Sequence, residues 1–210
     1  MTKSREPARV KLIDSPESEW EPGGPVTSRQ EAEVTLPRSE LDRIWNPEYL
    51  ERLARTYWRW LSKISLGVLR VVYTPTSRRI VFLTPPLTLL RFHAPEYETE
   101  PECGTVTWRI DRGLLVAPPG RGKGFLRIKV TRAAGAEGDE VTARVSSEVA
   151  NFYPALGGWG WFARIGAKIY RFTQLKLHVL VTNGFLRSLA RLELVPSKVG
   201  QLRTEIERPA

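Results

Sequence analysis

The sequence predicts an α+β fold, in which an antiparallel curved sheet of about six or seven strands packs against a long C-terminal helix. Three observations predict this class. Residues 47–64 place apolar side chains at three- and four-residue spacing, which is typical of an amphipathic helix. From residue 68 to residue 145, apolar and polar residues instead alternate with a period of two, which indicates strands with one dry face. The turns between them are short, so neighbouring strands should pair antiparallel.

Composition sets the domain organisation. The chain has 210 residues, of which 41% are hydrophobic and 26% are charged, which is the balance of a globular protein. Residues 1–30 are rich in proline, glycine and charge and lack an apolar period, so we expect a flexible leader. Residues 31–195 then form a single domain, and residues 196–210 form a flexible tail. Five basic and five acidic residues cancel in the leader, so the net charge of +9 belongs to residues 31–210.

The predicted helix at 47–64 has a clear beginning. Asn46 supplies a side-chain acceptor at the cap, Pro47 suits the first helical position, and Glu48 faces the positive end of the helix dipole. One face of this helix is apolar and the opposite face is cationic. A shorter helical piece around 39–45 is expected before it.

The predicted strands follow from β-branched and aromatic runs bounded by turn residues. They cover 31–36, 68–73, 79–83 and 87–93, followed by three alternating segments centred on Trp108, Ile128 and Ala143.

The cover of the sheet is predicted to be a helix over 162–192, where Ile165, Phe172, Val179 and Leu186 repeat at seven-residue spacing. A competing interpretation remains open for 175–192. Residues 175–181 also alternate between apolar and other side chains, and Asn183-Gly184 is a strong hairpin signal.

This order of elements resembles the helix-grip fold of the START-like superfamily, which includes polyketide cyclases, lipid-transfer domains and plant pathogenesis-related proteins. The segment Val34–Pro37 before a helix with an early Trp, and the strand beginning Gly122–Ile128, are similar to the family. The helical region before the second strand is longer and more basic than the usual pair of short helices. The resemblance implies a cavity between sheet and C-terminal helix that accommodates an apolar small molecule or lipid.

The side chains that would face such a cavity are mostly alternate residues of the predicted strands. They are Trp108, Ile110, Leu126, Ile128, Val145, Phe172 and Val179. The alternative is that these residues fill an ordinary close-packed core, because alternation does not distinguish a cavity wall from a filling.

The sequence carries no recognisable catalytic signature, and we expect no cofactor. His93, His178 and the lone Cys103 do not provide ligands at metal spacing. The glycine-rich run 120–124 lacks the spacing of a phosphate-binding P-loop and is interpreted as a hairpin tip. We therefore expect non-catalytic binding, with a cyclase- or dehydratase-like enzyme using the same cavity as the alternative.

A basic segment adds a possible second partner. Residues 151–192 contain six Lys and Arg and no Asp or Glu, next to Trp159 and Trp161. Aromatic and cationic residues together are typical of contact with anionic membranes, so Trp159, Trp161, Arg164, Lys168 and Arg171 are the predicted membrane contacts. Non-specific nucleic-acid binding and a merely solvated face are the alternatives. The charged start and the shortness of the apolar runs indicate a cytoplasmic protein with at most peripheral membrane contact.

Overall fold

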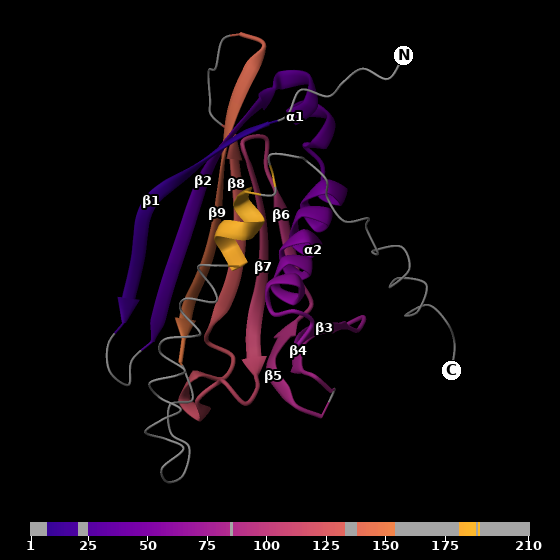
Figure 1. Ribbon diagram of the computed structural model, residues 1–210, viewed down its shortest axis with the longest axis vertical. Coiled ribbons are helices and arrows are strands. Elements are labelled where there is room, and N and C mark those ends of the chain that lie inside the picture. Colours follow the sequence, from indigo (N-terminus) through magenta and orange to yellow (C-terminus); the bar gives the residue numbers. More distant parts are fainter. Residues whose placement is uncertain are drawn as a thin grey trace, which may run out of the picture.

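The computed structural model describes residues 8–20, 25–84, 86–132, 138–153, 181–187 and 189 (Figure 1). Strands dominate it, with two helices inserted after the second strand. In chain order the elements are β1 Arg9–Trp20, β2 Val26–Pro37, α1 Arg38–Ile44, α2 Pro47–Ile64, β3 Leu69–Tyr73, β4 Ser77–Phe82, β5 Thr88–His93, β6 Glu96–Thr99, β7 Cys103–Arg112, a 3₁₀ turn Pro118–Gly120, β8 Phe125–Arg132 and β9 Glu140–Phe152.

The strands form one antiparallel sheet of nine strands with the order β1-β2-β9-β8-β7-β5-β4-β3, and β6 pairs with β7 beside this path. β2 and β9 are neighbours although they are far apart in sequence, with Ala32 opposite Val145 and Val34 opposite Ala143. The strand directly before the helices, β2, therefore lies beside β9, and the strands from β3 to β9, apart from β6, follow one another as a meander. The fold class is α+β, as the sequence predicted, and the arrangement is helix-grip-like.

Helix α2 has the predicted bounds, and its predicted cap is confirmed. The Asn46 side chain accepts a hydrogen bond from the Tyr49 backbone N–H at 3.0 Å, and Pro47 occupies the first turn. The expected helical piece before it is α1, which begins without a side-chain cap.

The inner face of the sheet forms the core together with α2. Alternate residues of β2, β7, β8 and β9 are buried there, as their period of two predicted. Trp58 of α2 lies over Trp108 of β7 with ring centroids 5.1 Å apart, and over Phe92 of β5 at 5.4 Å. Among the described elements, α2 is thus a main cover of the sheet, a role that the sequence assigned to the C-terminal segment.

The sheet is larger than predicted because β1 and β6 add to it. Residues 9–20 and 26–30, expected within a flexible leader, are paired strands, with Val10 opposite Val34 and Leu12 opposite Ala32. Val10 and Leu12 pack against the core, and Ala8 just before the strand is buried. The alternation of apolar residues in β1 is short and interrupted by charged residues, so the sequence shows no sustained apolar period there. The pairing of β1 with β2 also shifts register between Ile13 and Glu17. The domain boundaries at 31 and 195 stay predictions.

Of the predicted C-terminal helix over 162–192, only residues 181–187 and 189 fall within the described part, and residues 181–187 are helical. Asn183 and Gly184 lie inside this helical segment, so the hairpin turn proposed there is wrong. Phe185 packs edge-on against Tyr57 with centroids 5.5 Å apart. A Cβ on Gly184 would lie 3.2 Å from Trp60 and Ile64, so the segment approaches α2 closely. The predicted tail at 196–210 lies outside the described residues.

Candidate functional site: an apolar cavity under the helical elbow

An apolar cavity lies between the inner face of the sheet and the elbow where α1 turns into α2. Its volume is about 90 Å³. Strands β2, β7, β8 and β9 form its floor, and the two helices form its roof. The lining residues are Val34, Leu36, Leu41, Ile44, Trp45, Asn46, Tyr49, Leu50, Leu53, Thr99, Gly104, Val130, Ala143, Val145 and Leu189.

The size of the cavity limits what it holds as it stands. An engineered apolar cavity of roughly 150 Å³ takes up benzene, and pockets for drug-sized ligands span about 300–1,000 Å³. At about 90 Å³ this cavity is smaller than both. A lipid chain or aromatic molecule therefore requires the elbow to move away from the sheet.

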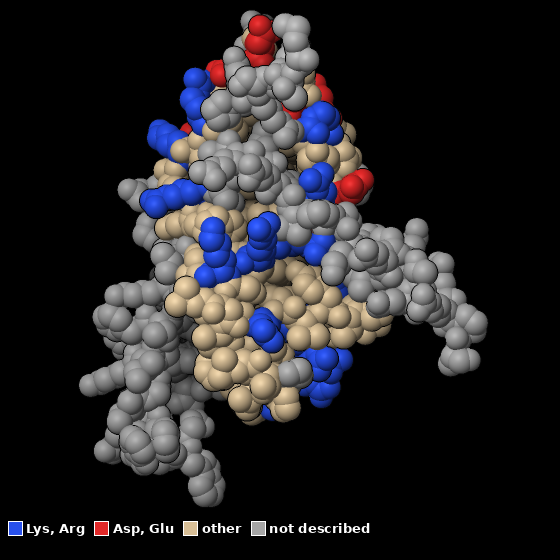
Figure 2. Space-filling view, turned by 45° about the vertical axis from the view of Figure 1, so that its right-hand side comes forward, with Lys and Arg blue, Asp and Glu red and all other residues tan. Residues whose placement is uncertain are grey.

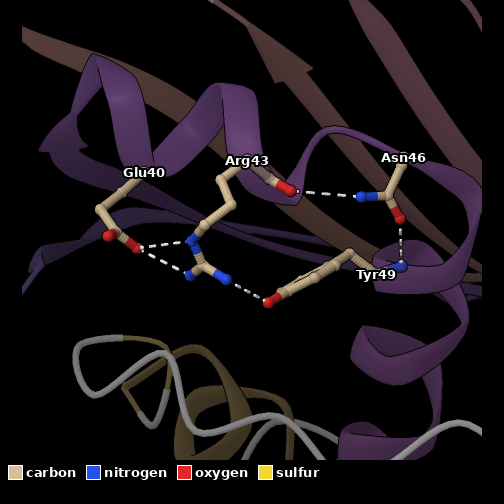
Figure 3. Close-up of polar contacts among 4 residues, drawn as sticks. All are labelled: Glu40, Arg43, Asn46 and Tyr49. Atoms are coloured by element: carbon tan, nitrogen blue, oxygen red, sulfur yellow. Dashed lines mark hydrogen bonds and ion pairs between the residues drawn. The ribbon is translucent and has the colours of Figure 1, made fainter.

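Polar contacts hold the elbow in shape (Figure 3). Arg43, near the end of α1, donates to Glu40 at 2.7 Å and to the Tyr49 hydroxyl at 2.6 Å. The Asn46 amide donates to the Arg43 carbonyl at 3.2 Å while its oxygen caps α2. Asn46 and Tyr49 also line the cavity. The residues that close the cavity are thus tied together by hydrogen bonds rather than by apolar packing alone.

A second set of contacts joins α1 to the end of β8 and to the residue just before β9. Arg132 of β8 pairs with Asp42 of α1, and its guanidinium lies 5.8 Å from the Trp45 ring centroid. The Arg38 backbone N–H donates to the Asp139 carbonyl at 2.8 Å. Asp42 is half-exposed and such ion pairs contribute little to stability, so these contacts orient the elbow more than they stabilise the fold.

The sequence-predicted ligand residues divide into three groups. Val145 lines the cavity. Trp108, Ile110, Leu126 and Ile128 are buried in the core and are not among the cavity lining. Phe172 and Val179 lie outside the described residues, as do the predicted membrane contacts Trp159, Trp161, Arg164, Lys168 and Arg171.

The helical side of the cavity was missed as a site. Leu50 and Leu53 belong to the apolar face that the sequence predicts for the helix at 47–64, whereas no predicted apolar face includes Leu41, Ile44 and Trp45. Their spacing of three and four residues over the short predicted helix is the signal that could have assigned them to one face.

The described lining offers little acid–base chemistry. It contains no Asp, Glu, His, Cys, Lys or Arg, and its polar side chains are those of Asn46, Tyr49 and Thr99. His93 is exposed at the end of β5. Cys103 is half-buried, with its sulfur 3.6 Å from the Thr105 hydroxyl. Among the residues that the structure describes, no three potential metal ligands come together.

Polar groups are buried deeper under α2. Burial raises the pKa of Tyr57 to about 12, although the Thr182 and Ser147 hydroxyls near its phenol act in the opposite direction. The indole N–H groups of Trp58 and Trp108 have no hydrogen-bond partner within the described part of the chain. Since an unpaired buried donor costs about 1–3 kcal/mol, the aromatic packing here must outweigh that cost.

Comparison with known proteins gives structural similarity only. No protein-family model matches the chain, and no curated protein matches it. Among solved structures, norcoclaurine synthase from Thalictrum flavum is 15% identical, with 87% of this chain and 98% of that chain covered and a TM-score of 0.34. Human STARD10 is 9% identical, with 90% and 76% covered and a TM-score of 0.29. CalU16 from Micromonospora echinospora is 10% identical, with 88% and 95% covered and a TM-score of 0.27.

TM-scores below 0.5 are too low to support a conclusion about the ligand or activity of this chain. Its helix-grip-like class rests on its own order of strands, with β2 beside β9 and two helices inserted after β2. Within the described part of the chain, no helix combines the length and apolar character that crossing a bilayer requires.

Proposed function

We propose that this protein binds an apolar small molecule or lipid, without catalysis, in the cavity between the sheet and the α1–α2 elbow. The observation that carries the proposal is the cavity itself. Of its fifteen described lining residues, three carry polar groups, namely Asn46, Tyr49 and Thr99. The other twelve are apolar or aromatic residues and one glycine. The apolar walls of an unfilled hollow lack dispersion contacts on one side, and a bound apolar group would supply those contacts.

Ligand entry follows from the way the elbow is held. The contacts of Arg43 with Glu40 and Tyr49 are part-exposed, so water competes with them and they break at low cost. Opening the elbow would lift Trp45 and Tyr49 from the sheet and enlarge the cavity. The opening would then supply the volume that a lipid chain needs.

The proposal also includes weak association with an anionic membrane through Trp159, Trp161, Arg164, Lys168 and Arg171. Its support is the charge balance of residues 151–192, which contain six Lys and Arg and no Asp or Glu. Replacing Arg164, Lys168 and Arg171 with Gln should weaken binding to anionic vesicles and its salt dependence. Replacing both tryptophans with Ala should weaken binding even at high salt.

The cavity is tested by filling it. Gly104 lies in β7, and a Cβ there would meet Leu50 at 3.7 Å, which is an ordinary contact. Gly104→Val therefore puts a branched side chain into the cavity, in a strand that favours such residues. Thr105→Val is the matched control, because the next residue along a strand projects from the opposite face.

Binding is measured with a fluorescent fatty acid, and native mass spectrometry of the gently purified protein identifies any retained ligand. We expect Gly104→Val to reduce probe affinity at least fivefold with little loss of thermal stability, and Thr105→Val to leave affinity unchanged. Probe binding that both variants retain in full would show that the cavity is not the binding site.

A further inference from the structure

We propose that the protein contacts anionic bilayers through a second surface, made by three neighbouring turns that display exposed leucines. This leucine surface consists of Leu66, Phe82, Leu83, Leu87 and Leu114. None of its residues belongs to the segment 159–171. The inference rests on the proposed function only in taking an anionic membrane as the partner.

Backbone hydrogen bonds place the three turns side by side. Leu66 lies in the turn from α2 to β3, and the Leu83 N–H, just after β4, donates to Val68 of that turn at 2.8 Å. The Phe82 N–H donates to the Leu87 carbonyl at 2.9 Å, which closes the β4–β5 turn. The Leu114 N–H, after β7, donates to the Thr88 carbonyl at 3.1 Å. Five large apolar side chains from three connections therefore gather at one end of the sheet.

Their exposure is unusual for side chains of this size. The exposed fractions are 91% for Leu66, 61% for Leu114, 52% for Leu83, 45% for Leu87 and 39% for Phe82. Within the described part of the chain, the next most exposed large hydrophobic residue is Tyr97, at 37%. A contiguous exposed apolar patch is a mark of an interaction surface, whereas scattered single residues are not.

The backbone conformation of two of these leucines is unfavourable for a residue with a side chain. Leu66 has φ of 52° and Leu83 has φ of 57°, both in the left-handed region that favours glycine. Leu66 occupies the residue after the C-cap of α2. Its N–H donates to the Lys63 carbonyl at 3.1 Å and the next N–H donates to Ser62 at 2.8 Å, which is the Schellman ending where glycine is usual. A leucine in this left-handed conformation costs backbone energy, and its exposed side chain gains nothing from burial in the fold. Contact with a partner would explain why leucine stands at this position.

The charge around these turns points to an anionic partner. Residues 52–95, which run from within α2 to just past β5, contain eight Lys and Arg and no Asp or Glu. Lys63 and Arg70 are exposed and lie within four residues of Leu66. On the face in Figure 2, Asp and Glu lie in the upper half, whereas Lys and Arg continue over the lower half, the end that carries the β4–β5 turn.

An anionic bilayer fits this combination better than another copy of the chain. Protruding turns with leucine tips can enter the headgroup region, while Lys63 and Arg70 remain level with lipid phosphates. Two copies facing each other through this surface would bring like charges together, which disfavours self-association. A protein partner would need an acidic rim around an apolar centre.

The test uses variants that remove the leucine side chains without harming the fold. Glycine suits the left-handed backbone, so the double variant Leu66→Gly and Leu83→Gly should be at least as stable as the unmodified protein. Asn151→Gly is the matched control, since Asn151 is exposed with φ of 51° and lies in β9, outside the leucine surface. Binding is measured by co-sedimentation with phosphatidylcholine vesicles containing phosphatidylserine, and with phosphatidylcholine vesicles alone.

We expect the double glycine variant to bind the anionic vesicles roughly tenfold or more weakly, because burying a leucine side chain contributes at least that factor. Asn151→Gly should bind unchanged. Lys63→Gln and Arg70→Gln should each lower binding about fivefold at low salt. Lys129→Gln, on an exposed position of β8, is the control for charge and should have less effect.

The outcomes separate this inference from the proposed function. Unchanged vesicle binding of the double glycine variant, with loss on replacing Trp159 and Trp161, would overturn the leucine surface and leave the proposed attachment intact. Vesicle binding that is absent from the unmodified protein would overturn both membrane contacts, whereas fatty-acid binding would still test the cavity by itself. Capture of an acidic protein or concentration-dependent dimerisation that the glycine variant abolishes, without vesicle binding, would assign the surface to another partner and overturn the proposal.

Discussion

Replacing Trp108 distinguishes a core residue from a ligand-contacting one. Trp108 is 1% exposed, lies edge-on to Trp58 with ring centroids 5.1 Å apart, and is not among the residues that line the cavity. Truncation of a buried tryptophan to alanine costs about 3–5 kcal/mol. For a protein of this size, each kcal/mol lowers the thermal midpoint by about 2–4 °C. Trp108→Ala should therefore lower the midpoint by about 6–20 °C.

Trp108→Phe refines the experiment. Phenylalanine keeps an aromatic ring against Trp58 and removes the indole N–H, which has no hydrogen-bond partner among the described residues. Since an unpaired buried donor costs about 1–3 kcal/mol, losing it offsets part of the lost packing. We expect Trp108→Phe to cost less than about 2 kcal/mol, which urea unfolding measures.

Fatty-acid affinity is measured for both variants below their unfolding temperatures. If Trp108 belongs to the core, Trp108→Phe binds the probe with unchanged affinity and the folded fraction of Trp108→Ala does the same. A tenfold loss of affinity in Trp108→Phe, with stability near that of the unmodified protein, would refute this reasoning. It would return Trp108 to the ligand site that the sequence predicted.

Three further predictions follow from burial and capping. Because burial raises the Tyr57 pKa from 10 to about 12, its contribution to folding is complete below pH 10 and is lost as the pH rises towards 12, by about 2–3 kcal/mol; urea unfolding across this range should show the decline, and Tyr57→Phe should flatten it. Asn46→Ala should lower the unfolding free energy by about 0.5–2 kcal/mol through loss of the α2 cap, whereas Asn46→Ser, which keeps an acceptor, should lose less. Deleting residues 1–30 should lower the thermal midpoint by several degrees, because it removes β1, whose Val10 and Leu12 pack against the core, together with buried Ser28 and Gln30 of β2, which pair with β9; an unchanged midpoint would support the predicted flexible leader.

Local signals in the sequence predicted local structure well. The Asn46 cap and Pro47 predicted the start of α2 because the interactions involved lie within four residues of one another. Alternation predicted the strands around Trp108, Ile128 and Ala143 because their apolar residues point to the inner face of the sheet, although Thr105 and Thr107 of β7 are buried as well. Such signals need no knowledge of the rest of the chain.

Features that depend on distant partners were not predictable in the same way. β1 is a strand because it pairs with the edge of β2. The charged, proline-containing sequence of 9–20 does not by itself predict that pairing. The cavity forms where α1 and α2 turn over β2 and β9, which meet only in the folded chain. Alternation correctly indicated that Trp108 and Val145 face inward. Which of them lines the cavity depends on where α1 and α2 pack over the sheet, and this places Val145 in the lining and Trp108 in the core.

Helix α2 separates the two proposed contacts. Asn46 and Tyr49, at its beginning, line the cavity, and Leu66 follows its end. Eighteen helical residues span about 27 Å at 1.5 Å per residue, so the elbow and the leucine surface lie at opposite ends of a long helix. If the leucine surface rests on a membrane with α2 along the membrane normal, the elbow faces away from that membrane. A ligand would then exchange through the elbow with the surrounding water or another carrier, and the leucine surface would hold the protein at the membrane rather than load it.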